Sequence, residues 1–151
     1  MMAAGNTAFD CVVDASVGIK LFLIEPLSEQ ADSLFGHLTD DPPSRLYVPD
    51  LFFVECANIL WKYVRRHGFP EDAARQAVAD LRRLSLRSVS TRMLCEAALA
   101  LSVAHESTAY DSAYVALAAQ LSLPLVTADE AMVRRFEHTG LDVRFLGVWP
   151  G

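Results

Sequence analysis

The sequence contains few residues that crosslink a chain or hold a soft metal ion. Of its 151 residues, three are cysteines, Cys11, Cys56 and Cys95, and none lies near another in a CxxC pattern. This odd, scattered set argues against a disulfide framework and favours buried, reduced thiols. The four histidines are equally scattered, with no spacing typical of a metal site.

Long apolar runs, a basic leader and an excess of positive charge are also missing. Lys20 and Glu25 interrupt the best apolar stretch, which falls short of the ~20 residues that span a membrane. The N-terminus lacks the basic segment of a signal peptide, so we expect a cytoplasmic protein with no membrane partner. The net charge of −6 argues against non-specific coating of nucleic acid. It does not exclude a nucleic-acid enzyme, because acids gathered to hold a metal lower the charge themselves.

What the sequence does contain is a globular composition, with 52% hydrophobic and 21% charged residues. A chain of this length and composition favours one domain with a sizeable core. We therefore expect a single domain spanning 1–151, with its core at about 9–146.

Apolar segments of strand and helix length alternate along the chain. Strands are predicted at 9–13, 46–48, 86–89, 125–127 and 143–146, the last of them at an edge. Helices are predicted at 15–24, 28–38, 51–66, 71–84, 91–104 and 110–121, and again after residue 129. This alternation predicts a three-layer α/β/α fold, in which helices cover a central parallel sheet of about four or five short strands. The helix at 91–104 is apolar nearly all round, so we expect it to be deeply packed.

Two aspartates follow predicted strands, at the ends where open α/β sheets bind ligands. Asp14 ends the strand at 9–13, and Asp129 follows the strand at 125–127. A third, Asp111, lies in the first turn of the helix that precedes the latter strand. Because right-handed crossovers place the ends of parallel strands at one rim, we expect these carboxylates to lie close together.

Glu55 is an anomaly in the helix at 51–66. Its neighbours one turn away are apolar, and an acid beside an apolar stripe needs a partner or a shifted pKa. Asn58, three residues on, lies beside Glu55 and is predicted to orient it. Asp50 is predicted to cap the N-terminus of the same helix.

Each acid also has a purely structural interpretation. Asp14 and Asp129 suit helix N-caps, worth about 1 kcal/mol each, and Asp111 suits a capping box with Thr108. Glu55 would be an ordinary surface acid if its helix were turned the other way. Taken together, four acids without basic partners would repel one another, and a bound divalent cation removes that cost. Oxygen ligands without nearby His or Cys favour Mg²⁺, with Mn²⁺ as a substitute.

Several segments resemble the PIN domain, and more narrowly the VapC-type toxins of bacterial and archaeal toxin–antitoxin pairs. The segments are FDCVVDASV, FFVECANIL and YDSAYVALAAQLSLPLVTAD, together with the closing apolar strand. The likeness runs from about Phe9 to Leu146, and its most specific part is the string from Tyr110 to Asp129. The stretch at 65–90 carries no family signature.

The resemblance implies a PIN-like fold and a metal-dependent endoribonuclease that cuts RNA with metal-activated water. The four matched acids, expected to catalyse and to bind Mg²⁺, are Asp14, Glu55, Asp111 and Asp129. One or two ions would fit, and Glu55 would act as a ligand or as a base toward the water. The residues expected to support these acids are Ser16, Asn58 and Thr127. The resemblance also implies a cognate antitoxin protein as partner and a homodimer as the assembly.

Three other classes stay open. A haloacid-dehalogenase-type phosphatase, another metal-dependent phosphohydrolase, needs a second Asp two residues after the first, where Ser16 stands. A response-regulator receiver needs an acidic pair near the first strand and a Lys after a late strand, and neither is clear. A catalytically silent PIN-like module that binds RNA or protein is disfavoured by the four intact acids.

Overall fold

The computed structural model describes residues 8–149 and contains five parallel β-strands in one sheet. The ends of the predicted 1–151 domain, including the N-terminal segment at which we predict no signal peptide, lie outside these residues. The strands are β1 (Cys11–Val13), β2 (Leu46–Pro49), β3 (Arg87–Val89), β4 (Leu125–Thr127) and β5 (Val143–Phe145). Their order is β3-β2-β1-β4-β5, which confirms the parallel sheet and the edge position of the last strand.

The neighbouring strands β1 and β4 are entirely buried. Val12 pairs with Tyr47 on one side and with Leu125 on the other, so β1 is the middle strand of the sheet. Short apolar runs such as CVV are typical of central parallel strands, because neither face of such a strand meets water.

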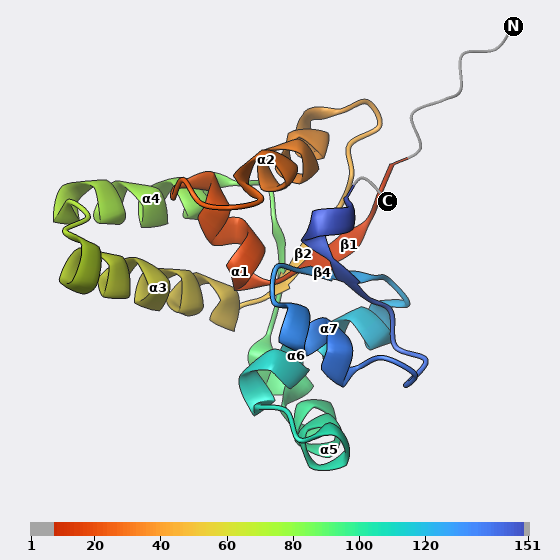
Figure 1. Cartoon of the computed structure of the whole chain (residues 1–151). Coiled ribbons are helices and arrows are strands. Elements are labelled where there is room, and N and C mark those ends of the chain that lie inside the picture. The colour runs from red at the N-terminus through yellow and green to blue at the C-terminus, as the bar shows by residue number, and fades with distance from the viewer. Residues whose placement is uncertain (1–7, 150–151) are drawn as a thin grey trace, which may run out of the picture.

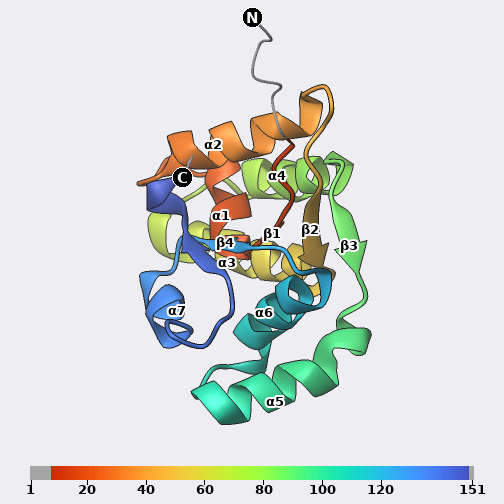
Figure 2. The same cartoon turned by 90° about the vertical axis from the view of Figure 1, so that its right-hand side faces the viewer.

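Seven α-helices surround the sheet within the described residues. They are α1 (Ala15–Gly18), α2 (Ser28–Gly36), α3 (Leu51–His67), α4 (Glu71–Arg83), α5 (Cys95–His105), α6 (Ala109–Leu121) and α7 (Glu130–Arg135). Figure 2 shows α1 and α2 on one side of the sheet, and α6 with α5 on the other. This arrangement confirms the three-layer α/β/α fold. None of these described helices combines the length and the apolar character that a membrane crossing requires.

Helices α3 and α4 form a hairpin that projects from the body of the molecule (Figure 1). α3 ends where Gly68 adopts a φ of 64°, a backbone conformation that glycine reaches without strain. α4 starts after Pro70, with two acids in its first turn and two arginines in its last, as the helix dipole favours. The other end of α3 contacts α1 and β2, and it carries Glu55.

The segment after β1 is held closely against α3. A Cβ atom at Gly18 in α1 would lie 2.5 Å from the Phe52 ring, so the two helices approach as closely as a glycine allows. Beyond α1, Lys20 pairs with Glu25 at 2.8 Å, and the same carboxylate accepts a 2.8 Å hydrogen bond from Tyr63 on α3. These contacts fix the position of α3 relative to the end of β1.

The prediction that the helix at 91–104 is deeply packed was wrong. Residues 91–94 form a 3₁₀ turn, and α5 begins only at Cys95. Within α5 Ala98 is buried, whereas Leu99 and Val103 are 61% and 77% exposed. The reason is that α6, whose residues 112–118 are all buried, occupies the layer against β1 and β2. α5 packs on the outside of α6 and turns much of its apolar surface to solvent.

Two smaller predictions also need correction. The helix expected at 15–24 is the short α1 followed by a 3₁₀ turn at Ile19–Leu21. Asp50 precedes α3 but does not cap it with its side chain. Instead Asp50 Oδ1 accepts hydrogen bonds from the hydroxyl and the backbone N–H of Thr91, and these bonds lower the Asp50 pKa. Asp50 thus joins the start of α3 to the segment after β3.

Candidate active site

Four acidic side chains come together at the carboxyl end of the sheet. They are Asp14 directly after β1, Glu55 in the second turn of α3, Asp111 in the first turn of α6 and Asp129 at the start of α7. Beyond burial, which is the larger cause, the charge of Asp14 raises the pKa of Glu55 and of Asp111. The charge of Asp129 likewise raises the pKa of Asp14 and of Asp111. The fold therefore gathers all four predicted acids at one rim.

Asp14 is the most firmly held of the four. Its side chain is 6% exposed, and Oδ2 accepts hydrogen bonds from the hydroxyls of Ser16 at 2.6 Å and Thr127 at 2.8 Å. Burial raises the Asp14 pKa, and these two bonds oppose that rise. The same hydroxyls accept the N–H groups of Ala128 and Asp129, so they join the ends of β1 and β4. The side chain of Asp14 does not cap α1.

Glu55 is half-buried at the base of α3. Burial, followed by the charges of Asp14 and Asp111, raises its pKa to about 7. Its Oε1 atom is buried without a hydrogen-bond partner among the described residues, which is rare in native proteins. Asn58 is exposed and makes no hydrogen bond to Glu55 in this structure, so its orienting role stays a prediction.

Asp111 and Asp129 combine capping contacts with free carboxylate oxygens. The Thr108 hydroxyl accepts the Asp111 N–H at 3.2 Å, while the Asp111 carboxylate makes no hydrogen bond with a described residue. Asp129 caps α7 through Oδ1, which accepts the N–H groups of Ala131 and Met132. One oxygen of Asp129 is thus used by the helix, and the other is left for a ligand.

Little positive charge opposes this acidic cluster. Burial, followed by the charges of Asp14 and Asp129, raises the pKa of Asp111 to about 6, although the Arg135 guanidinium acts in the opposite direction. Among the described residues, no ion pair joins any of the four acids to a basic side chain. The cluster therefore stays under repulsion at neutral pH unless a cation binds to it.

Tyr114 belongs to this site and was missed by sequence reasoning. Its ring is fully buried on α6, and its hydroxyl makes no well-formed hydrogen bond with a described residue. Burial, then the charges of Asp14 and Glu55, raises the Tyr114 pKa far above its usual range, while the hydroxyl in turn lowers the pKa of Glu55. Its spacing of three residues from Asp111 was the available signal, because such residues share a helix face.

The donor chemistry suits a hard divalent cation. All four acids offer oxygen ligands, and burial with mutual repulsion raises the pKa of three of them. A cation would relieve this repulsion and satisfy the unpaired Glu55 oxygen. Within residues 8–149, no three acidic, histidine or cysteine side chains converge closely enough to hold an ion as they stand. Binding therefore requires side-chain rotation, for which Glu55, Asp111 and Asp129 are sufficiently exposed.

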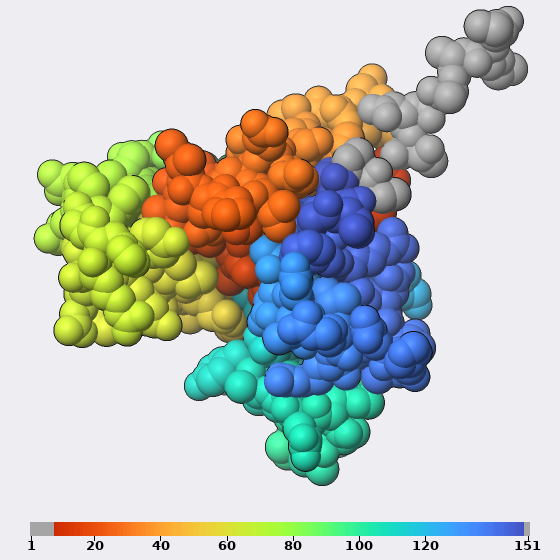
Figure 3. All heavy atoms as spheres, viewed as in Figure 1, coloured from red at the N-terminus to blue at the C-terminus, as the bar shows by residue number. Residues whose placement is uncertain are grey.

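A groove of about 660 Å³ opens beside these acids, between α3 and the start of α6. Figure 3 shows the surface hollowed between the α3–α4 hairpin and the α5–α6 pair. Glu55 and Asp111 lie in opposite walls of the groove, and Asn58, Lys62 and Tyr110 continue these walls away from the acids. An extended ligand can therefore reach the carboxylates from solvent.

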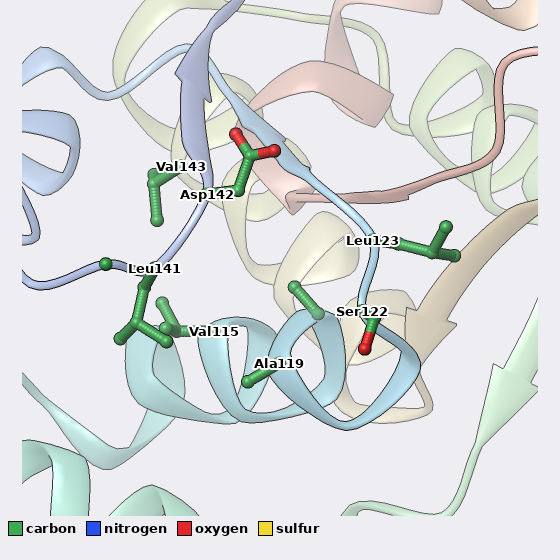
Figure 4. A pocket seen from close by; sticks show the side chains of 9 residues that line it. Val115, Ala119, Ser122, Leu123, Leu141, Asp142 and Val143 are labelled. Atoms are coloured by element: carbon green, nitrogen blue, oxygen red, sulfur yellow. The ribbon is translucent and has the colours of Figure 1, made fainter.

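A second pocket, of about 330 Å³, lies at the other end of the sheet. Figure 4 shows Val115 and Ala119 of α6 on one side of it, with Ser122 and Asp142 near the starts of β4 and β5. Asp142 is the acidic member of its described lining and already pairs with Arg144 at 2.9 Å. Ligands of open α/β sheets bind at the carboxyl ends of the strands, so this pocket is not the candidate active site.

Sequence comparisons identify the family. The PIN domain model matches residues 11–137. Ribonuclease VapC3 from Pyrobaculum aerophilum is 35% identical over 127 residues, which cover 83% of this chain and 93% of that protein.

Solved structures share the fold. PAE2754 from Pyrobaculum aerophilum has a TM-score of 0.68 at 24% identity, with 93% of both chains covered. VapC20 from Mycobacterium tuberculosis, described as a sarcin-ricin-loop-cleaving toxin, has a TM-score of 0.63 at 17% identity, covering 87% of this chain and 95% of that one. A toxin–antitoxin complex from Klebsiella pneumoniae has a TM-score of 0.58 at 17% identity, covering 90% of this chain and 97% of that one. By its family match and its 35% identical relative, this chain belongs to the PIN domain family, in the VapC-type group.

Proposed function

We propose that this protein is an Mg²⁺-dependent endoribonuclease and the toxin of a toxin–antitoxin pair. The observation that carries the proposal is the convergence of four carboxylates from four elements beside one open groove, in a chain of the VapC-type group. The ribonuclease name of the 35% identical relative supports RNA as the substrate.

The four acids would hold Mg²⁺, or Mn²⁺ in its place. A bound divalent ion supplies positive charge to phosphodiester oxygens and lowers the pKa of water. Asp14 sets the position of the site, because two hydroxyls hold its Oδ2 and burial keeps it in place. Glu55 has a pKa of about 7, which suits either a ligand or a group that takes a proton from water near neutral pH.

The second candidate function is a catalytically silent PIN-like module that binds RNA or protein. It draws support from the lack of three converging ligands within residues 8–149. The enzyme is favoured because all four acids are present and their repulsion is costly unless a cation binds. A silent module would gain nothing from keeping that cost.

The test is RNA cleavage by the purified protein. We expect cleavage with millimolar Mg²⁺ or Mn²⁺, none in EDTA, and restoration when Mg²⁺ is added back. The matched control is Asp14→Asn purified in the same way, because a contaminating nuclease would copurify with both proteins. Cleavage that persists in EDTA, or that is equal for the two proteins, contradicts the proposal.

The partners we propose are RNA, a cognate antitoxin and a second copy of the chain. The toxin–antitoxin complex among the structural neighbours supports the antitoxin as a partner. The exposed apolar side chains Leu99 and Val103 on α5, with Met93 just before it, support a homodimer. Light scattering in solution tests the dimer, and copurification with the product of an adjacent short reading frame tests the antitoxin. An enzyme with these partners would act in the cytoplasm.

A further inference from the structure

The groove beside the acids carries two side chains that the proposed metal chemistry does not use. Lys62 lies on α3, seven residues after Glu55, and Tyr110 lies on α6, directly before Asp111. At 1.5 Å per residue, Lys62 is roughly 10 Å from Glu55 along the helix axis. The two side chains therefore line the part of the groove next to the acids, on opposite walls.

Lys62 is exposed and forms no ion pair with a described residue. Two other cations of this region are engaged: Lys20 pairs with Glu25, and Arg65 lies over the Trp61 ring at 5.1 Å. Arg135, whose charge lowers the pKa of Asp111, does not line the groove. Lys62 is thus a cation that lines the acidic groove without being neutralised there. A phosphate that passed the acids would meet this ammonium next.

Tyr110 is 68% exposed, which is unusual for a ring at the start of a helix whose next seven residues from Ser112 are buried. No aromatic contact covers the ring among the described residues. A groove that holds both an exposed aromatic ring and a cation is the arrangement by which proteins bind single-stranded nucleic acid, with bases stacked on rings and phosphates near cations.

We propose that this part of the groove is a subsite for one unpaired nucleotide next to the cleaved phosphate. Tyr110 stacks on its base, and the Lys62 ammonium contacts its phosphate. This inference rests on the proposed ribonuclease function and adds which two side chains contact the nucleotide next to the cleaved phosphate. RNA is favoured over a protein partner because the groove pairs a free cation with a ring beside carboxylates that would hold a metal and a phosphate.

The test measures single-turnover cleavage of a single-stranded oligoribonucleotide with the enzyme in excess. The readout is the enzyme concentration that gives half the maximal rate, together with that maximal rate. For Lys62→Gln we expect the half-saturating enzyme concentration to rise about fivefold at 0.1 M salt, because one phosphate contact is lost. A plot of the logarithm of this concentration against the logarithm of salt concentration should have a slope smaller by about 0.7. Arg65→Gln, which removes the same charge outside the groove, should leave both values unchanged.

For Tyr110→Ala we expect half-saturation to weaken by about 5- to 150-fold, the range for loss of one stacked base. Tyr110→Phe should retain the wild-type value, since a phenyl ring also stacks. Trp61→Ala, which removes an exposed ring on the other side of α3, should have no effect. Maximal rates should change much less than half-saturation, which a general loss of structure would not produce.

An abasic scan then locates the base. Removing one particular base near the cleavage site should weaken binding to wild type and to Tyr110→Phe, but not further to Tyr110→Ala. If wild type cleaves and neither the Lys62→Gln nor the Tyr110→Ala variant alters half-saturation, the subsite is wrong and the two side chains serve another partner, such as a protein. If wild type neither cleaves nor binds RNA, the proposed function fails, and the subsite with it.

Discussion

Thr127 shows how much of this site depends on single hydroxyl groups. It is fully buried at the end of β4, donates to the Asp14 carboxylate and accepts the Asp129 N–H. Thr127 therefore positions two of the four acids, Asp14 and Asp129, from a strand that is distant in sequence from β1.

Thr127→Val keeps the shape of this side chain and removes its hydroxyl. We expect about a 10- to 100-fold rise in the Mg²⁺ concentration needed for cleavage, as is typical when a group that orients a metal ligand is lost. The free energy of unfolding should fall by about 1–3 kcal/mol, because a buried acceptor loses a donor. Thr127→Ser is the control, and a Val variant with the wild-type Mg²⁺ dependence would show that the contact does not position the site.

Substitution of the aspartates by asparagine separates catalysis from helix capping. Asn caps about as well as Asp, so Asp129→Asn should leave α7 intact and the melting temperature nearly unchanged. We expect each of Asp14→Asn, Asp111→Asn and Asp129→Asn to lower cleavage by at least about a hundredfold, like other losses of a group that stabilises the transition state. Circular dichroism checks the fold. Near-wild-type rates in all three variants would leave the acids a purely structural role.

At the scale of elements, the contact between α1 and α3 is the tightest constraint on the site. A glycine at a helical position usually costs stability relative to alanine. At Gly18, however, a Cβ atom would lie 2.5 and 2.8 Å from two atoms of the Phe52 ring. The close approach brings the helix after Asp14 against the helix that carries Glu55.

We therefore predict opposite effects at two glycines with similar backbone angles. Gly18→Ala should lower the free energy of unfolding by about 1–3 kcal/mol, the usual cost of overpacking. Gly36→Ala, where a Cβ would meet no atom within 4 Å and φ is −57°, should raise it by roughly 0.5–1 kcal/mol. Urea denaturation of both variants is the measurement. Equal shifts would mean that the α1–α3 contact relaxes without cost.

The element pattern could be predicted well where local signals are strong. The strands predicted at 125–127 and 143–146 and the helix predicted at 71–84 match β4, β5 and α4 to within one residue, because short apolar runs and charges that suit the helix dipole mark them. The placement of α5 could not, because Leu99 and Val103 look the same in sequence whether a sheet, another chain or water covers them. Asp50 was likewise misassigned, since its partner Thr91 lies 41 residues away.

At the scale of the whole molecule, the acidic cluster should make metal-free stability depend on pH. The pKa of Glu55 rises from 4.5 to about 7 and that of Asp111 from 3.8 to about 6, so the folded state binds protons more readily than the unfolded state. Stability from this source therefore falls as pH rises from about 4 to about 7. Because Mg²⁺ competes with these protons, the stability gained from Mg²⁺ should grow over the same range.

Melting curves at pH 5.5 and pH 8, with EDTA or with millimolar Mg²⁺, check this prediction. In EDTA the wild type should melt lower at pH 8 than at pH 5.5, and Asp111→Asn should show a smaller difference. At pH 8 in EDTA, Asp111→Asn should melt at or above the wild type, because one repelling charge is gone. The same variant should gain less from Mg²⁺. A variant that melts lower in EDTA yet gains as much from Mg²⁺ would make Asp111 a structural residue.

The four acids could be predicted from sequence because each lies at a strand end or on an inward helix face, and because the set matches the family pattern. Tyr114 could not, since its spacing from Asp111 indicates a shared helix face but not that its hydroxyl faces carboxylates from two other elements. Nor does the sequence show that the four side chains stop short of a ready ion site. Whether the four side chains form a ready ion site depends on their rotamers, and the spacing of residues in the sequence does not indicate these.

The position of β4 next to the middle strand of the sheet has a consequence for the order of biosynthesis. β4 pairs with β1, the first strand of the chain, and supplies the hydroxyl that holds Asp14. A ribosome that has translated the chain only as far as Pro124 has therefore made Asp14, Glu55 and Asp111, but neither this strand nor Asp129. Under the proposed ribonuclease function, the nascent chain would lack a complete site, and could not cut the messenger being read, until the segment with β4 and Asp129 has left the ribosome.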